Sequence, residues 1–178
     1  MHPDVSHLVL SEDQIRDRVH ELGRQISADY GDESILLVGV LRGAALFMAD
    51  LARAITSPVE VDFMAVSSYG SSTKSSGVVR IIKDLDETVE DRNVLVVEDI
   101  LDTGLTLKYL LKNLASRKPR SLEVVTLLNK VGKQQVPIQC KYTGFDIPDE
   151  FVIGYGLDYA ERYRNLPYIG VLRPEVYA

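Results

Sequence analysis

One short stretch of the sequence restricts the fold more than any other. Residues 93–97 (NVLVV) form a largely apolar run, which is typical of a strand buried on both faces in a parallel sheet. Two acids, Glu98 and Asp99, follow directly, and the apolar residues of 103–116 then recur with the period of a helix. A fully buried strand that leads into a helix indicates an α/β protein with helices on both faces of its sheet.

The rest of the chain repeats this alternation of strand and helix. Ser11 and Gln14 have the spacing of a capping box at the start of the first helix, and Gly31 is expected to end it. The expected helices cover about 11–31, 44–55 and 103–116, and the expected strands cover 35–40, 59–66, 78–82, 93–97 and 122–128. This order predicts an open, mainly parallel twisted sheet with flanking helices.

The length of 178 residues predicts a single domain, residues 1–178. Its core is expected to span about 34–130. The C-terminal third is more aromatic and is interrupted by prolines. We therefore expect about 131–178, together with about 1–33 and its helix, to form a small hood subdomain over one edge of the sheet. Neither an internal repeat nor a linker divides the chain.

Composition and charge narrow the possible functions. The net charge is −6 and no basic block occurs, which argues against general nucleic-acid binding. No apolar run approaches the roughly 20 residues that cross a bilayer, and the N-terminus lacks the pattern of a signal peptide. Cys140 is the only cysteine, so an internal disulfide is excluded. We expect a soluble cytoplasmic protein that binds neither nucleic acid nor membranes. An acidic protein can still bind phosphate, but it must do so with backbone amides, a few placed cations or a metal.

The residues that follow strand 93–97 have the chemistry of a ribose 5-phosphate site. In an open α/β sheet, ligands bind beyond the carboxyl ends of the strands, which is where Glu98 and Asp99 fall. These carboxylates can accept hydrogen bonds from a vicinal diol or hold Mg²⁺ through water. The turn 102–106 (DTGLT) lies at a helix N-terminus, whose free N–H groups and positive dipole end bind phosphate.

A capped helix or a nucleotide-binding loop accounts for this stretch less well. Asp and Thr are ordinary helix caps, and a lone Asp-Thr-Gly would be explained as well by a capped helix. A GxxxxGK[ST] loop is absent from the sequence, and Gly154-Tyr155-Gly156 lacks the third glycine of a dinucleotide-binding loop. The number of acids and hydroxyls around one strand end favours a binding site.

Several motifs resemble those of one enzyme family. Residues 96–104 (VVEDILDTG) are similar to the phosphoribosyl pyrophosphate (PRPP) motif of type I phosphoribosyltransferases. The motifs that resemble the hypoxanthine-guanine branch, in the same order, are 41–43 (LRG), 68–70 (SYG), 128–130 (LNK), 148–159 (PDEFVIGYGLDY) and 162–168 (RYRNLPY). The resemblance covers nearly the whole chain. It implies the type I phosphoribosyltransferase fold and a Mg²⁺-dependent purine-salvage enzyme that converts hypoxanthine or guanine and PRPP to IMP or GMP and pyrophosphate.

The resemblance also implies which residues bind the sugar and its phosphates. Those implied for the ribose and the 5′-phosphate are Glu98, Asp99, Asp102, Thr103, Gly104, Leu105 and Thr106. Those implied for pyrophosphate are Leu41, Arg42, Gly43, Ser68, Tyr69 and Arg164. The Leu41–Arg42 peptide bond is expected to be cis. The Ser- and Gly-rich stretch 67–77 is expected to close over the site as a lid.

The base is implied to lie against the C-terminal third. The implied purine-binding residues are Lys130, Phe151, Val152 and Asp158, and the implied magnesium ligands are Glu98, Asp99 and Asp158. Lys130 is expected to donate to the 6-oxo group, Phe151 to stack on the ring and Val152 to contact the edge of the base through its backbone. Asp102 is the implied catalytic residue, a general base at purine N7.

Two positions depart from the family pattern. Residues 131–135 (VGKQQ) stand where relatives often carry a proline and one or two arginines. Lys133 is the expected cation there, and pyrophosphate affinity is the property affected, because Lys and Arg bind phosphate oxygens differently. Leu105 replaces a lysine of some relatives, a loss that backbone amides should cover. Taken singly, Arg42, Lys130 and Phe151 would be interpreted as ordinary surface or core residues.

Two other functions stay open at this point. A uracil phosphoribosyltransferase of the bifunctional pyrimidine-regulator type shares the ribose motif, but it would lack the string 151–158 and usually has a basic RNA-binding face. A non-catalytic sensor that only binds PRPP usually carries an added DNA-binding domain, whereas 1–33 holds one amphipathic helix. The sequence does not rank hypoxanthine, guanine and xanthine. Relatives are commonly homodimers or homotetramers, so a homo-oligomer is expected.

Overall fold

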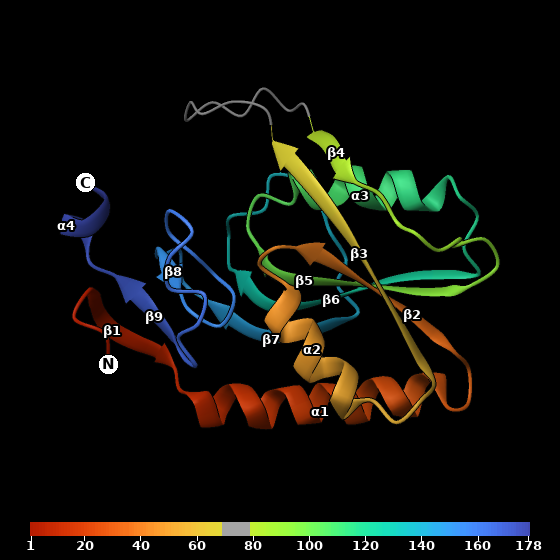
Figure 1. Ribbon diagram of the computed structural model, residues 1–178, viewed down its shortest axis with the longest axis horizontal. Coiled ribbons are helices and arrows are strands. Elements are labelled where there is room, and N and C mark those ends of the chain that lie inside the picture. The colour runs from red at the N-terminus through yellow and green to blue at the C-terminus, as the bar shows by residue number, and fades with distance from the viewer. Residues whose placement is uncertain (69–78) are drawn as a thin grey trace.

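A six-stranded sheet forms the centre of the protein in a computed structural model that describes residues 1–68 and 79–178 (Figure 1). The strands are β2 (Ile35–Leu41), β3 (Val59–Ser68), β4 (Val79–Lys83), β5 (Asn93–Leu101), β6 (Ser121–Lys130) and β7 (Tyr142–Ile147). Their order is β4-β3-β2-β5-β6-β7, and all neighbours pair in parallel except β4, which runs antiparallel to β3. The expected open, mainly parallel sheet is confirmed.

Three helices cover the two faces of this sheet. On one face lie α1 (Glu12–Tyr30) and α2 (Ala45–Ala54), and on the other lies α3 (Leu105–Ala115) (Figure 1). The capping box is confirmed, because Ser11 Oγ accepts from Gln14 N at 3.2 Å and Gln14 Oε1 accepts from Ser11 N at 2.9 Å. None of the helices in the described ranges is both long and apolar enough to span a bilayer.

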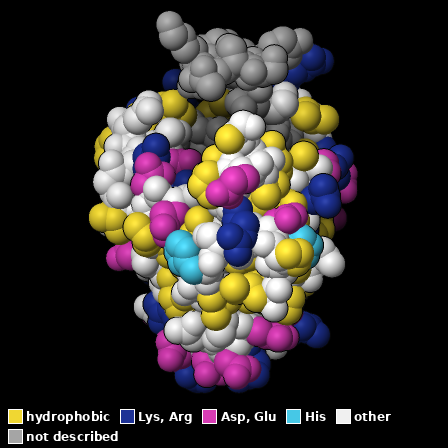
Figure 2. Space-filling view, turned by 90° about the vertical axis from the view of Figure 1, so that its left-hand side faces the viewer, with side chains coloured by type: hydrophobic (Ala, Val, Ile, Leu, Met, Phe, Trp, Pro, Cys, Tyr) yellow, Lys and Arg dark blue, Asp and Glu magenta, His cyan; other side chains and the backbone are white. Residues whose placement is uncertain are grey.

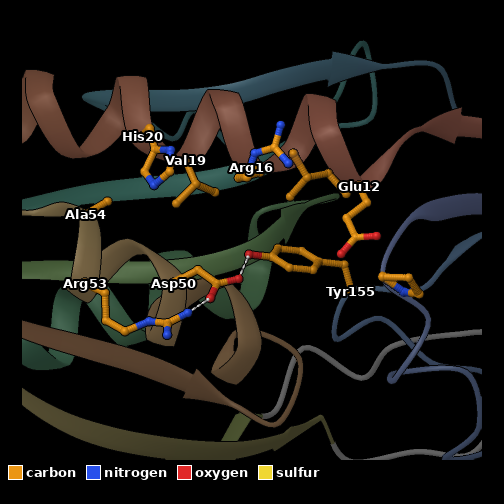
Figure 3. Close-up of a pocket in the computed structure, with 10 residues that line it drawn as sticks. Glu12, Arg16, Val19, His20, Asp50, Arg53, Ala54 and Tyr155 are labelled. Atoms are coloured by element: carbon orange, nitrogen blue, oxygen red, sulfur yellow. Dashed lines mark hydrogen bonds and ion pairs between the residues drawn. The ribbon is translucent and has the colours of Figure 1, made fainter.

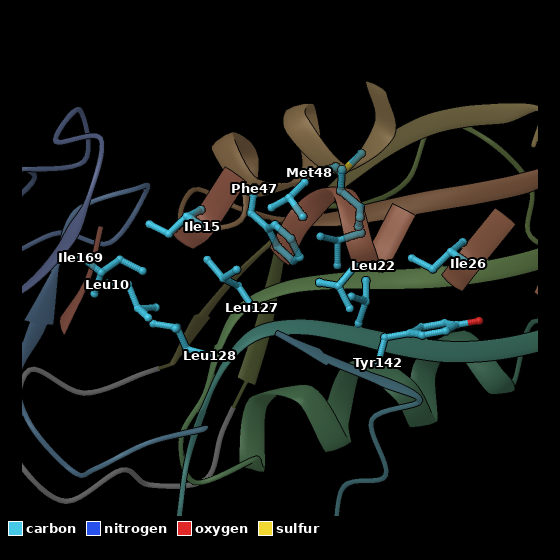
Figure 4. Packing of buried hydrophobic residues seen from close by; sticks show 14 of the residues in the cluster. Leu10, Ile15, Leu22, Ile26, Phe47, Met48, Leu127, Leu128, Tyr142 and Ile169 are labelled. Atoms are coloured by element: carbon cyan, nitrogen blue, oxygen red, sulfur yellow. The ribbon is translucent and has the colours of Figure 1, made fainter. Parts of the chain in front are cut away.

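Hydrophobic side chains fill the layers on both sides of the sheet. Successive residues of a strand point to opposite faces, so Leu95 packs towards α1 and α2 whereas Val96 packs towards α3. Figure 4 shows Leu22, Phe47 and Leu127, from α1, α2 and β6, gathered in the first of these layers. Full burial of such side chains contributes about 1.5–3 kcal/mol each, so these layers hold the helices against the sheet.

A small antiparallel sheet stands beside the large one. Its strands are β1 (Val5–Leu10), β9 (Ile169–Leu172) and β8 (Val152–Ile153), in the order β1-β9-β8, and the short helix α4 (Pro174–Tyr177) follows β9. Figure 1 shows this hood at the left, next to the carboxyl ends of the long strands.

The hood differs in extent from the sequence-based expectation. The sequence predicts the first helix as part of the hood, yet α1 packs against α2 and β7 in the main core, and the N-terminus adds only β1 to the hood. Residues 142–147 are expected in the hood as well, yet they form β7 of the large sheet. An amphipathic stripe shows that a helix covers an apolar surface but not which surface, and β1 and β7 are short strands of mixed polarity.

The order of the strands fixes where a ligand is expected. The chain leaves β2 towards β3 and β4, and it leaves β5 in the opposite direction towards β6 and β7, while β2 and β5 pair side by side with Gly39 opposite Val97. Connections that diverge at two neighbouring parallel strands open a crevice beyond their carboxyl ends. Residues 41–43 and 98–104 lie at and just beyond these two strand ends.

Candidate active site

The turn between β5 and α3 forms the floor of a small cavity. The strand runs on to Leu101 and the helix starts at Leu105, with Gly104 at the N-cap in a left-handed conformation (φ 83°). A cavity of about 180 Å³ opens above this turn, and its lining residues are Val40, Glu98, Ile100, Leu101, Asp102, Thr103, Gly104, Thr106 and Leu107. The first N–H groups of an α-helix have no intrahelical partner, so the start of α3 offers donors to an anion in this cavity.

The segment after β6, which the sequence analysis expected in the hood, covers this turn instead. Gln135 N donates to Thr103 O at 2.9 Å, so the chain after β6 is tied to the turn. A Cβ atom at Gly104 would lie 3.0 Å from Ile138 Cγ1 and 3.3 Å from Val136 Cγ2. A side chain at position 104 would therefore meet a close contact in addition to the strain of the positive φ. The irregular residues 131–141 gave no periodic signal that would have revealed this packing.

Glu98 and Asp99 stand at the carboxyl end of β5, and both are half-buried. Glu98 lines the cavity, whereas Asp99 lies against Gly43 on the α2 side. Burial, and then the neighbouring charge of Asp99, raises the pKa of Glu98 well above its ordinary value. Burial raises the pKa of Asp99 as well. Because the charged forms of both carboxylates are disfavoured, hydroxyl donors or a cation would stabilise them.

The loop after β2 lies against both acids and the hood. The Leu41–Arg42 peptide bond is cis, as expected. A Cβ atom at Gly43 would lie 1.7 Å from Asp99 Oδ2, and one at Gly156 would lie 2.2 Å from Gly43 O. The Gly43 backbone thus lies directly against the Asp99 carboxylate on one side and against the Gly156 backbone of the hood on the other. This contact places the hood on the loop after β2.

Arginines and acids form a chain at the rim of the hood. Glu161 accepts from Arg42 Nη1 at 2.7 Å and from Arg164 Nη2 at 3.2 Å, so it bridges the two arginines expected at pyrophosphate. Arg164 also pairs with Asp158 at 3.1 Å and donates to Gly156 O at 2.6 Å. The sequence analysis missed Glu161, because only the fold brings 42 and 161 together. A diphosphate would compete with Glu161 for both guanidinium groups.

Lys130 and Asp102 meet across the ends of β6 and β5. Lys130 Nζ lies 3.9 Å from Asp102 Oδ2 and 3.5 Å from Asp149 Oδ1, and the Lys130 side chain is only 12% exposed. Asp102 Oδ1 is buried and has no hydrogen-bond partner among the described residues. A fixed ammonium group and a carboxylate with a free acceptor therefore stand next to each other above the sheet.

Phe151 presents a partly exposed aromatic ring on the hood. Its side chain is 39% exposed, and its ring stacks on Tyr177 at 4.9 Å between centroids and meets Tyr159 edge-on at 5.8 Å. Val152 is buried in β8, where it pairs with Val171 of β9. Phe151 is thus available for stacking, while Val152 can reach a ligand only through its backbone.

The three expected magnesium ligands do not gather into one cage. Within 1–68 and 79–178, no three Asp, Glu, His or Cys side chains lie together as metal ligands, and Asp158 pairs with Arg164. Mg²⁺ usually takes one or two protein carboxylates and completes its shell with water and substrate phosphates. The raised pKa values of Glu98 and Asp99 show a pair of carboxylates that a positive charge would stabilise. These residues fit a metal ion that arrives with a diphosphate.

Part of the expected pyrophosphate site cannot be placed. Ser68 ends β3 at the same edge of the sheet as Leu41. Tyr69 and most of the stretch 67–77 lie outside the described residues. The expected lid therefore stays a prediction.

A second and larger cavity lies away from these residues. It measures about 470 Å³ and is enclosed by α1, α2 and the hood (Figure 3). Tyr155 donates to Asp50, which also pairs with Arg53 on its wall. None of the expected site residues that the structure describes lines it. We place the site at the smaller cavity, because Glu98, Asp102 and the N-terminus of α3 line it and Lys130 lies 3.9 Å from Asp102.

The chain is similar to known proteins over almost its whole length. Residues 9–160 match the phosphoribosyl transferase domain family. The hypoxanthine-guanine phosphoribosyltransferase of Bacillus subtilis is 54% identical over 177 residues, which are 99% of this chain and 98% of that protein. A crystal structure of a hypoxanthine phosphoribosyltransferase from Staphylococcus aureus matches with a TM-score of 0.96 and 52% identity, covering 100% of this chain and 97% of that chain.

Some relatives are much longer. The Listeria innocua protein named Bifunctional protein TilS/HprT is 53% identical over 178 residues, which are 100% of this chain and 28% of that protein. The chain therefore spans little more than a quarter of these bifunctional relatives.

The contact between Gly156 and Gly43 gives a testable prediction for stability. Gly156→Ala should lower the free energy of unfolding by about 1–3 kcal/mol more than Gly132→Ala, because overpacking against a backbone oxygen adds to the strain of a positive φ. Gly132 is the matched control, since its φ is also positive (79°, against 98° at Gly156) but a Cβ atom there would meet nothing within 4 Å. Urea unfolding measures both, and equal losses would contradict the prediction.

Proposed function

The chain belongs to the hypoxanthine-guanine phosphoribosyltransferase family, and we propose that it transfers the phosphoribosyl group of PRPP to N9 of hypoxanthine or guanine. The products are IMP or GMP and pyrophosphate, which makes the reaction a step of purine salvage. The proposal rests on the activity for which relatives 52–54% identical over nearly the whole chain are named, and on the chemistry of the candidate site.

The pairing of Asp102 with Lys130 is the observation that carries the proposal. N7 and the 6-oxo group of a 6-oxopurine are neighbours on one edge of the base. A carboxylate with a free acceptor and an ammonium 3.9 Å away match a protonated N7 and a 6-oxo group in that order. Adenine would place a 6-amino donor against the Lys130 ammonium, which has no acceptor. A site built in this way discriminates strongly against the wrong group.

The start of α3 and the end of β5 have the groups that would bind the sugar phosphate. The N–H groups at the start of α3, with Thr103 and Thr106, would bind the 5′-phosphate, and Gly104 lets it approach the backbone. Glu98 and Asp99 would accept hydrogen bonds from the ribose hydroxyls. The half-burial of both carboxylates supports this role, since hydroxyl donors would replace the water that they lack.

Proton transfer is the chemical role proposed for Asp102. The C1–O bond of PRPP breaks and pyrophosphate leaves with its electron pair, while the N9 lone pair of the base bonds to C1. The proton on N7 passes to Asp102, so the nucleotide forms as a neutral base. Arg42 and Arg164 would bind the departing pyrophosphate in place of Glu161, stabilising charge where it develops.

Mg²⁺ is the proposed cofactor. Glu98, Asp99 and Asp158 would hold it together with the diphosphate of the substrate, and when bound it neutralises charge on the leaving group. Asp158 is also proposed to stand near the base, as the resemblance implies.

Domain organisation, location, assembly and partners are also proposed. We propose that residues 1–178 act as one domain, a view supported by a hydrophobic cluster that joins α1, the large sheet and the hood. We propose a cytoplasmic homodimer or homotetramer that binds neither nucleic acid nor membranes. On the face that carries the hood, acidic and basic side chains are interspersed and form no single basic patch, which supports the absence of a nucleic-acid partner (Figure 2).

The function is tested by a panel of bases assayed with PRPP and Mg²⁺. Hypoxanthine, guanine or xanthine should turn over fastest, because only 6-oxopurines offer an acceptor to Lys130. Adenine and uracil should be poor substrates, slower by about 10⁴-fold if the site rejects unpaired donors as strictly as polar pockets can. Fastest turnover of uracil would favour the pyrimidine enzyme, and PRPP binding without turnover of any base would favour a sensor.

The role of Asp102 is tested by Asp102→Asn. The variant should keep its thermal stability and lose about 10²–10⁴-fold in kcat, the usual contribution of a general base. Asp86→Asn is the control, because it removes the same charge from a side chain that is 82% exposed and pairs with Lys83. If Asp102→Asn keeps nearly full kcat, Asp102 does not take the proton.

A further inference from the structure

Asp149 lies within the motif 148–159 and contacts Lys130 in the candidate site, but the sequence analysis gives it no role. It lies in the connection from β7 to β8, directly after Pro148. Asp149 Oδ1 is 3.5 Å from Lys130 Nζ, and Asp149 Oδ2 is 2.9 Å from Lys133 Nζ. One carboxylate therefore contacts both lysines of the 130–133 turn.

Lys130 needs such a contact if it is to select a base. A lysine carries its charge on a flexible four-carbon stem and has three equivalent donors. In this site its ammonium group stands between two carboxylates, Asp102 at 3.9 Å and Asp149 at 3.5 Å. The two acids belong to different segments, the turn after β5 and the connection from β7 to β8, so together they restrict where the ammonium group can point.

This cluster contains two lysines, Lys130 and Lys133, and two acids, Asp102 and Asp149. Lys133 holds the outer oxygen of Asp149, and hydrogen bonding to Lys133 lowers the pKa of the Asp149 carboxyl below its ordinary value. Asp149 is therefore ionised at neutral pH. Lys133 was expected to supply a cation for pyrophosphate, but it contacts the acid beside the base-binding lysine. Its contact with Asp149 links Lys133 to Lys130 in one cluster.

We propose that Asp149 is a positioning residue that fixes Lys130 and thereby sets the preference for 6-oxopurines over 6-aminopurines. The inference rests on the proposed function, since it deepens the role of Lys130. Without Asp149, Asp102 is the one acid left beside the Lys130 ammonium among the described residues, and the ammonium would turn towards the carboxylate that must accept the N7 proton. Base binding and base selectivity would weaken together, while the binding of PRPP would not change.

The test compares Asp149→Asn with Glu150→Gln. Glu150 is the adjacent acid, but it pairs with His7 at 3.5 Å on the hood, so its loss controls for a missing charge in the same turn. Asp149→Asn should raise KM for hypoxanthine by roughly tenfold, as partners that orient a binding group commonly do, and lower the hypoxanthine-to-adenine preference by a similar factor. KM for PRPP should stay at the wild-type value, and Glu150→Gln should match the wild type throughout.

Two further variants separate positioning from general damage. Asp149→Glu keeps the charge and should recover most of the base affinity. In a Lys130→Met background, Asp149→Asn should have little further effect on KM for hypoxanthine, because residues that act through one another are not additive. Additive effects would overturn the proposal, and so would equal KM values for hypoxanthine in Asp149→Asn and Glu150→Gln. If the wild-type protein turns over no 6-oxopurine, the proposed function itself fails, an outcome distinct from failure of the Asp149 variants alone.

Discussion

The side-by-side pairing of β2 and β5 is the constraint on which the site depends. The chain leaves these strands in opposite directions, so the carboxyl edge of the sheet opens between 41–43 and 98–104. Gly43 then lets the loop after β2 lie against Asp99, and Gly156 brings the hood onto the same loop. The two glycines bring the acids at the end of β5, the loop after β2 and the hood together, because a side chain at either position would keep them apart.

An acidic protein binds a polyanion through backbone amides, a metal or a few cations held at the site. The structure shows two small clusters in which two cations share one acid. Arg42 and Arg164 share Glu161 at the rim of the hood, and Lys130 and Lys133 share Asp149 beyond the end of β6. Acids that hold cations in place until a ligand arrives reconcile a net charge of −6 with the proposed binding of PRPP.

Local patterns predicted the parts of the fold that depend on neighbouring residues. The apolar run 93–97, the turn 102–106 and the capping box at Ser11 predicted β5, the start of α3 and the start of α1. The position of α1 and the strands β1 and β7 could not be predicted, because short or amphipathic segments do not reveal which surface they cover. Glu161 was missed because its contact with Arg42 spans 119 residues, and Asp149 was missed because β7 separates it in sequence from Lys130 and Lys133.

We propose that the sugar phosphate binds between the carboxyl end of β5 and the start of α3, while Asp102 and Lys130 hydrogen-bond to the base. A crystal structure with Mg²⁺, a non-reactive PRPP analogue and hypoxanthine tests it most directly. We predict the 5′-phosphate on the amides of 103–106, purine N7 on Asp102 and the 6-oxo group on Lys130. Binding of these ligands elsewhere, for example in the 470 Å³ cavity between α1 and α2, would contradict the claim.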